Sequence, residues 1–205
     1  MDRGNSSGPN IVDNYDTNTA SSDVTIPSSL YPAEQYGSCP QAVKGLNYDW
    51  PAMKTLVDDM SPAGSTNQAI GLQLGWLSLV GGGPFTVPAM DPNYTYSKII
   101  ILLTDGLNTQ DRWYGNGSSV GTTDDAKIDA RQQLTCDHIN AAGITLYTIQ
   151  VNTGGDATST LLQHCAGRPG MYPDSDKFFL LTSANQIVTT FTKIGTNLTQ
   201  LRVAR

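Results

Sequence analysis

The residue with the clearest chemical potential in this sequence is Asp105, which follows a run of apolar residues. Ile99 to Leu103 are all aliphatic, and Thr104-Asp105-Gly106 ends the run abruptly. A run that is apolar on both faces is typical of a strand inside a parallel sheet. Ligands of such sheets bind at the carboxyl ends of the strands. We therefore expect a buried strand from Lys98 to Asn108, with its apolar run at 99–103, that places the Asp105 carboxylate at the rim of a sheet.

A second candidate for chemistry is the segment Gly117-Ser118-Ser119-Val120-Gly121, which matches the G-x-S-x-G pattern of serine hydrolases. Histidines follow it along the chain at His138 and His164. The hydrolase pattern needs an apolar strand directly before its serine, whereas a polar loop precedes Ser119. We expect the match to be fortuitous and the protein to have no catalytic residue. A hydrolase that uses Ser119 is the alternative.

Composition narrows the class of protein. The 205 residues suffice for one domain with a core. The formal net charge is -6 and no Lys/Arg cluster is visible, so a nucleic-acid partner is not expected. No phosphate-binding loop is present, and no small-molecule substrate is inferred. The first residues of this sequence do not resemble a signal peptide, and we expect no membrane-spanning segment in it, because no apolar stretch is long enough to cross a bilayer.

The sequence contains three cysteines, Cys39, Cys136 and Cys165. A disulfide between Cys136 and Cys165 would close a loop of about 30 residues and stabilise the fold by roughly 3–4 kcal/mol. The alternative is a pair of small buried apolar side chains in a reducing compartment. In an oxidising compartment Cys39 would lack a partner.

Hydrophobic periodicity predicts the order of helices and strands from residue 47 onward. Residues 1–46 show no sustained pattern and are expected to form an irregular arm. The predicted helices span about 50–60, 68–80, 124–142, 159–165 and 183–202, and the predicted strands span 99–103, 144–151 and 178–181. The alternation of strands and helices predicts an α/β fold with a parallel sheet and helices on both faces.

Two of these helices carry specific predictions about burial. Helix 68–80 is apolar almost all the way round, which predicts burial on every side, Ile70 included. In helix 124–142 we expect Ile128, Leu134, Thr135 and Ile139 on the inner side.

Two segments are similar to known metal-site motifs. Gly64 to Leu72 and Ile100 to Gly106 look like the second and third motifs of the metal site in von Willebrand factor A domains. From about Tyr36 to Arg205 the chain more closely resembles the C-terminal part of Tad (tight adherence) pilus assembly proteins of the TadG kind. The features that carry the closer resemblance are Asn67 to Trp76, Leu102 to Gly106, Tyr147-Thr148-Ile149, Cys136 with Cys165-Ala166, and Ile194 to Arg202.

The resemblance implies a von Willebrand A fold over 47–205, with a Rossmann-like parallel sheet. It implies a non-enzymatic protein-binding domain for pilus assembly or adhesion, located outside the cytoplasm and membrane-anchored in its full-length form. In that family a divalent cation such as Mg²⁺ is held by oxygen ligands, which here match Thr66 and Asp105. The resemblance also implies the Cys136–Cys165 disulfide.

The chain departs from the family in one respect. The family's first metal motif, Asp-x-Ser-x-Ser after the first central strand, is absent. We therefore expect an incomplete metal site and missing N-terminal strands. The alternative is a structural fragment without metal, in which Thr66 caps a helix and Asp105 is a turn residue.

Trp113 and Tyr114 lie on the loop after Asp105 and would border the same rim. They could anchor a protein partner through their aromatic rings. More simply, they could pin down a long loop, which is the interpretation that we favour.

Overall fold

A computed structural model describes residues 40–82, 84–111, 114–117 and 120–203, with side chains up to residue 199. The chain divides into two compact units, and each is described by itself. The described part of the first unit covers 40–67 and 108–128, and that of the second covers 68–107 and 129–203.

Among the described residues of the first unit, one helix, α3 (Trp50–Asp58), comes before the loop that leads to α5 (Thr123–Ala141). Asp49 caps α3, because its side chain accepts a hydrogen bond from the backbone N–H of Ala52, and Pro51 lies in the first turn. The helix ends at Asp58, two residues before the predicted end.

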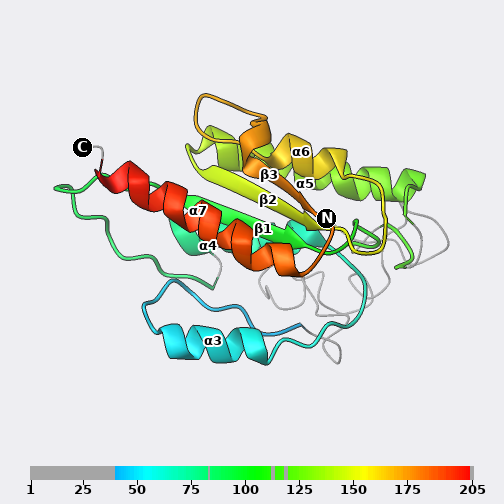
Figure 1. Cartoon of the computed structure of the whole chain (residues 1–205), viewed down its shortest axis with the longest axis horizontal. Coiled ribbons are helices and arrows are strands. Elements are labelled where there is room, and N and C mark those ends of the chain that lie inside the picture. The colour runs from blue at the N-terminus through cyan, green and yellow to red at the C-terminus, as the bar shows by residue number, and fades with distance from the viewer. Residues whose placement is uncertain (1–39, 83, 112–113, 118–119, 204–205) are drawn as a thin grey trace, which may run out of the picture. The chain divides into compact units, whose positions relative to one another are not determined.

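The second unit is built on a three-stranded sheet, shown in Figure 1. Its strands are β1 (Ile99–Thr104), β2 (Thr145–Val151) and β3 (Phe178–Leu181), in the order β1-β2-β3. Both neighbouring pairs are parallel, with Ile99 opposite Thr145 and Thr148 opposite Phe178. The predicted α/β class with a parallel sheet is therefore confirmed.

Helices cover both faces of this sheet. On one face lie α4 (Gln68–Val80), α5 (Thr123–Ala141) and α6 (Thr160–Cys165), and α7 (Asn185–Val203) crosses the other (Figure 1). A short 3-10 helix, η2 (Ser175–Lys177), leads into β3. The core on the first face consists of Leu72, Ile100, Cys136, Ile139, Ile144, Leu146, Leu161 and Cys165. The core under α7 consists of Tyr147, Ile149, Val151, Leu181 and Ile194.

The first predicted strand differs from the observed β1 in length and in burial. Strand β1 ends at Thr104 and does not continue to Asn108. The chain turns there, because the Thr104 hydroxyl donates a hydrogen bond to the Gly106 carbonyl and accepts one from the Gly106 N–H. The strand also lies at an edge of the described sheet, and the Leu103 side chain is 44% exposed. The expectation that the strand is buried on both sides is therefore wrong at this position.

Two predictions about helix burial also fail. Leu134 is 59% exposed, because the buried residues of α5 follow the positions of Ile128, Gln132, Cys136 and Ile139, and Leu134 lies off this stripe. On α4, Leu72 is buried, whereas Ile70 is 57% exposed. The described residues therefore cover helix α4 on one side only, and some of its apolar side chains remain exposed on the other.

No helix among the described residues is long and apolar enough to cross a membrane.

Candidate functional site

Asp105 lies directly after the carboxyl end of β1, at the position that the sequence predicted. Its carboxylate is exposed and makes no hydrogen bond or ion pair with any described residue. The turn beneath it is fixed by Thr104, whose hydroxyl donates to the carbonyl oxygen of Gly106 at 3.1 Å. The same hydroxyl oxygen accepts from the Gly106 N–H at 3.3 Å. The backbone on both sides of Asp105 is thus held, while its side chain has no partner in the part of the chain that the structure describes.

Two buried glutamines support this turn from below. The side-chain amide of Gln68 donates to the Gly106 carbonyl oxygen at 3.0 Å, and Gln132 donates to the Gln68 side-chain carbonyl at 3.1 Å. Gln132 is fully buried and Gln68 is 7% exposed. Because a buried amide is costly without partners, this relay fixes both side chains and the Asp105 turn together. The relay was not predicted from the sequence, although a glutamine at the start of an apolar helix is a polar residue in need of a partner.

A second ordered loop lies at the same carboxyl edge of the sheet. The Asn152 side chain accepts from the N–H groups of Gly155 and Asp156 at 2.9 and 2.8 Å and donates to the Asp156 carbonyl at 2.6 Å. Buried Gln150 donates to Ala157 O and accepts from Ser159 N–H. The loop after β2 is thus ordered by side chains from the end of the strand, as a rim that positions ligand groups requires.

Thr66 belongs to the first unit, and Asp105 belongs to the second. Thr66 is anchored through its backbone: its N–H donates to the Thr109 hydroxyl at 2.9 Å, and its carbonyl accepts from the Thr109 N–H at 3.0 Å. Its hydroxyl makes no hydrogen bond among the described residues, so it caps no helix there. The side-chain oxygen Oδ1 of the adjacent Asn67 is buried and has no hydrogen-bond partner among the described residues.

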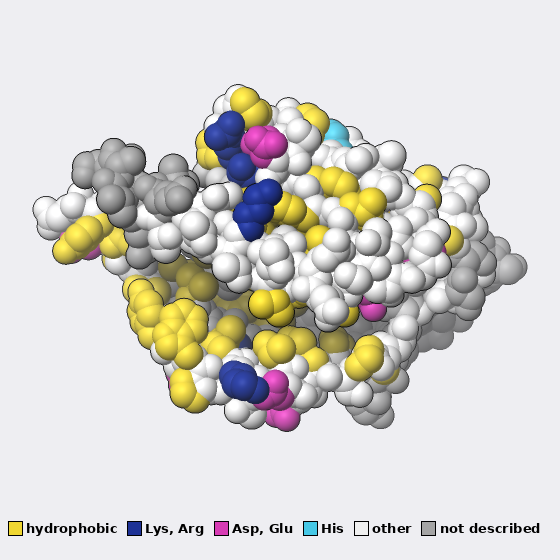
Figure 2. Space-filling view, in the orientation of Figure 1, with side chains coloured by type: hydrophobic (Ala, Val, Ile, Leu, Met, Phe, Trp, Pro, Cys, Tyr) yellow, Lys and Arg dark blue, Asp and Glu magenta, His cyan; other side chains and the backbone are white. Residues whose placement is uncertain are grey.

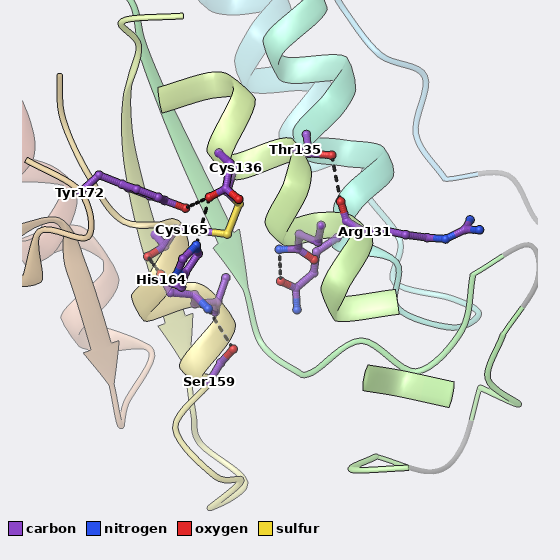
Figure 3. The surroundings of a disulfide bond; sticks show 12 residues. Arg131, Thr135, Cys136, Ser159, His164, Cys165 and Tyr172 are labelled. Atoms are coloured by element: carbon purple, nitrogen blue, oxygen red, sulfur yellow. Dashed lines mark hydrogen bonds and ion pairs between the residues drawn. A yellow bond between two sulfur atoms is a disulfide. The ribbon is translucent and has the colours of Figure 1, made fainter. Parts of the chain in front are cut away.

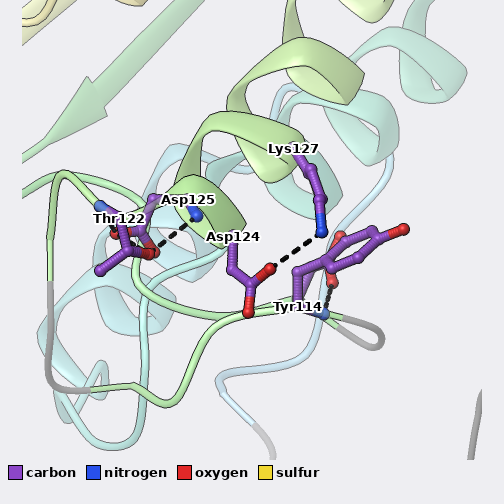
Figure 4. Close-up of polar contacts among 6 residues, drawn as sticks. Tyr114, Thr122, Asp124, Asp125 and Lys127 are labelled. Atoms are coloured by element: carbon purple, nitrogen blue, oxygen red, sulfur yellow. Dashed lines mark hydrogen bonds and ion pairs between the residues drawn. The ribbon is translucent and has the colours of Figure 1, made fainter. Parts of the chain in front are cut away.

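The loop after Asp105 is ordered around Tyr114, which is half-buried. Its N–H donates to the Asp111 carboxylate at 2.6 Å, and the Lys127 ammonium lies 4.5 Å from the centre of its ring (Figure 4). Lys127 also pairs with Asp124 at 3.1 Å. In this geometry Tyr114 holds the loop against the start of α5. Trp113 and Ser119 lie outside the described residues.

The start of α5 is closed by a reciprocal cap, also visible in Figure 4. The Asp125 carboxylate accepts from the N–H and the hydroxyl of Thr122 at 2.8 and 2.9 Å, and the Thr122 hydroxyl accepts from the Asp125 N–H at 3.2 Å. This arrangement corresponds to a capping box in which Asp takes the place of Glu. Asp125 is 5% exposed and serves the helix, so it is not a candidate ligand.

Cys136 of α5 and Cys165 of α6 form the disulfide of Figure 3. Their Cα atoms are 5.1 Å apart, and both side chains are fully buried. Cys39 lies outside the described residues. The bond ties the two helices that pack with α4 on one face of the sheet, so its role in the structure is to brace that layer.

Next to the disulfide cysteines in sequence lie two residues of a polar cluster that the sequence did not reveal. One carboxylate oxygen of Asp137 is 3.0 Å from His164 Nε2 and accepts from the Tyr172 hydroxyl at 3.0 Å. The His164 and Tyr172 rings meet edge to face with their centres 5.0 Å apart (Figure 3). These three residues come from α5, α6 and the loop after α6, so the cluster fastens the same layer as the disulfide.

The cluster predicts a loss of stability at alkaline pH. Burial, followed by the hydrogen bond and the charge of Asp137, raises the pKa of Tyr172 well above its usual value. The folded state therefore keeps the phenol proton above about pH 10, where the unfolded chain loses it, and the free energy of unfolding falls as pH rises from there. In urea titrations between pH 8 and 11, Tyr172→Phe should show a shallower decline than the wild type. Tyr48→Phe, at a 90% exposed position, should follow the wild type; equal slopes for both variants would contradict the prediction.

Comparison with known proteins adds no family assignment, since no family model, no curated protein and no solved structure matches this chain.

The candidate residues Thr66 and Asp105 carry the types of oxygen ligand that hard cations prefer. A hydroxyl and a carboxylate are ligands that Mg²⁺ accepts. No group of three or more His, Cys, Asp or Glu side chains gathers in a metal-binding arrangement in the described ranges. A cation at Asp105 would keep most of its coordination shell as water, which implies weak binding.

Proposed function

We propose that this chain is a protein-binding domain of the von Willebrand factor A type and that it has no catalytic activity. Its role in this proposal is assembly or anchoring of a Tad-type pilus at the bacterial cell envelope, outside the cytoplasm. The partner is another protein of that assembly, and the binding surface is the carboxyl edge of the sheet around Asp105.

The observation that carries the proposal is the state of the Asp105 carboxylate. It is exposed, it has no partner among the described residues, and it lies on a turn that Thr104 and Gln68 hold in place. An uncommitted carboxylate on a rigid turn at the ligand-binding edge of a parallel sheet suits recognition of a cation or of a partner's donor groups.

Surface charge is consistent with a protein partner. On the face shown in Figure 2, Lys and Arg side chains are few and scattered. The whole chain carries 12 Lys and Arg against 18 Asp and Glu. Nucleic-acid binding relies on clustered cations, which this composition does not favour.

The proposed site would hold a divalent cation through the Asp105 carboxylate and water. The bound cation would offer a water-occupied position to a carboxylate of the partner protein. With a single charged ligand, the affinity of the free chain for Mg²⁺ or Mn²⁺ is expected to be low.

The test is calorimetric titration of the purified chain with MnCl₂ and with MgCl₂. Asp105→Asn should weaken binding by about tenfold or more, because it removes the charged ligand. Asp156→Asn is the matched control, since Asp156 is an exposed acid on the loop after β2 at the same edge of the sheet. A metal signal that survives Asp105→Asn unchanged, or a wild type without any signal, would refute the proposed site.

A further inference from the structure

Strand β1 has the composition of an inner strand but occupies an edge of the described sheet. All of its residues except Thr104 are Ile or Leu. Natural edge strands usually carry a charge, a proline or a bulge that prevents pairing with another chain. None of these occurs between Ile99 and Thr104. Strand β3, at the opposite edge, has only four residues. The longer and unprotected edge is therefore that of β1.

The backbone groups that point outward from this edge can be identified from the register. The N–H of Thr145 on β2 donates to the carbonyl oxygen of Lys98. Because backbone groups alternate in direction along a strand, those of Ile100 and Leu102 also face β2. The N–H and C=O groups of Ile99, Ile101 and Leu103 point away from it. They have no strand partner among the described residues.

The side chains of these outward-bonding residues lie together on the face that α7 covers in part. Ile99 and Ile101 pack against the core under α7 and are half-buried. Leu103, the next residue on that face, is 44% exposed. The edge thus combines unpaired backbone groups with an aliphatic stripe, which are the two features that strand addition uses.

We propose that β1 pairs with β1 of a second copy of this chain, in antiparallel orientation about a twofold axis at Ile101. In that register each Ile101 faces its equivalent, and Ile99 of one copy faces Leu103 of the other. All opposed side chains on the α7 face are then aliphatic. Each opposed pair exchanges two backbone hydrogen bonds, and the two sheets become one continuous sheet.

Charge favours this orientation over a parallel one. Lys98 precedes β1, and Asp105 follows it. Antiparallel pairing brings the Lys98 end of each strand beside the Asp105 end of its partner, whereas parallel pairing would align like charges. A twofold contact of this kind is also closed, so that it produces a dimer and not an open chain.

The experiment is sedimentation equilibrium of the wild-type chain over a wide concentration range in buffer with EDTA, so that metal binding does not enter. We expect a monomer–dimer equilibrium. Leu103→Lys places a charge against the partner's Ile99 and should raise the dimer dissociation constant by about tenfold or more. Leu103→Pro removes an outward-pointing N–H of the strand without adding a charge and should do the same.

Leu134→Lys is the matched control, because Leu134 is 59% exposed on α5 and should leave the equilibrium unchanged. Circular dichroism confirms that each variant is folded before its mass is interpreted. A wild type that is monomeric at every concentration would overturn the proposal. A dimer that persists unchanged in both Leu103→Lys and Leu103→Pro would overturn it as well, since its contact would lie elsewhere.

Discussion

Replacing both Cys136 and Cys165 by alanine is expected to lower the free energy of unfolding by about 3–4 kcal/mol. The bond closes a loop with a sequence separation of 29 residues, so its loss frees the unfolded chain to explore many more conformations. Both sulfurs are fully buried in the core that also contains Ile139 and Leu146, and alanine leaves that core less well filled. Urea unfolding followed by circular dichroism measures the change.

Reductant supplies the control for this prediction. Dithiothreitol should shift the unfolding midpoint of the wild type toward that of the double alanine variant and should leave the variant itself unaffected. Equal midpoints for the oxidised wild type, the reduced wild type and the variant would show that the bond contributes nothing to stability.

The second large effect is expected at Ile139 of α5, where Ile139→Ala should cost about 2–5 kcal/mol. The side chain is fully buried between α5 and the sheet, in the cluster that includes Leu72 and Leu146. Removing three carbon atoms there loses their transfer free energy and leaves a cavity that the neighbouring helices cannot close.

Leu134→Ala on the same helix is the matched comparison, because Leu134 is 59% exposed and its truncation should change stability by no more than about 0.5 kcal/mol. The pair of variants, measured by the same urea titration, separates helix propensity from packing. Similar losses at both positions would contradict the packing described for α5.

The contrast between Ile139 and Leu134 also shows what periodicity can and cannot predict. Apolar spacing located α4 and β3 with their observed ends, because uninterrupted apolar runs and Gly or Pro boundaries are local signals. The side of α5 that faces the sheet is not a local property. Gln132 and Cys136 lie on the buried stripe, and no apolar period could distinguish that buried glutamine from an exposed one.

The candidate site was predictable in part for the same reason. Asp105 could be placed at a strand end from the chain alone, since the end of an apolar run is visible in the sequence. Its support by Gln68 depends on a contact across 38 positions of the chain, and the contact of Asp137 with Tyr172 spans 35. Hydrogen bonds at such separations follow from tertiary packing, for which a single sequence gives no signal.

The edge position of β1 could not be predicted from the sequence for a different reason. Its residues satisfy the pattern of a strand with neighbours on both sides, and strand order depends on which segments pair.

The relay from Gln132 through Gln68 to the Gly106 carbonyl has a consequence for how this sequence can vary. A change of either glutamine alone to an apolar residue leaves the other amide buried with a lost partner, whereas a joint change to two apolar residues removes the demand at both positions. Substitutions at Gln68 and Gln132 should therefore be accepted together more often than separately. The two positions are therefore expected to co-vary among related sequences, although 64 positions separate them along the chain.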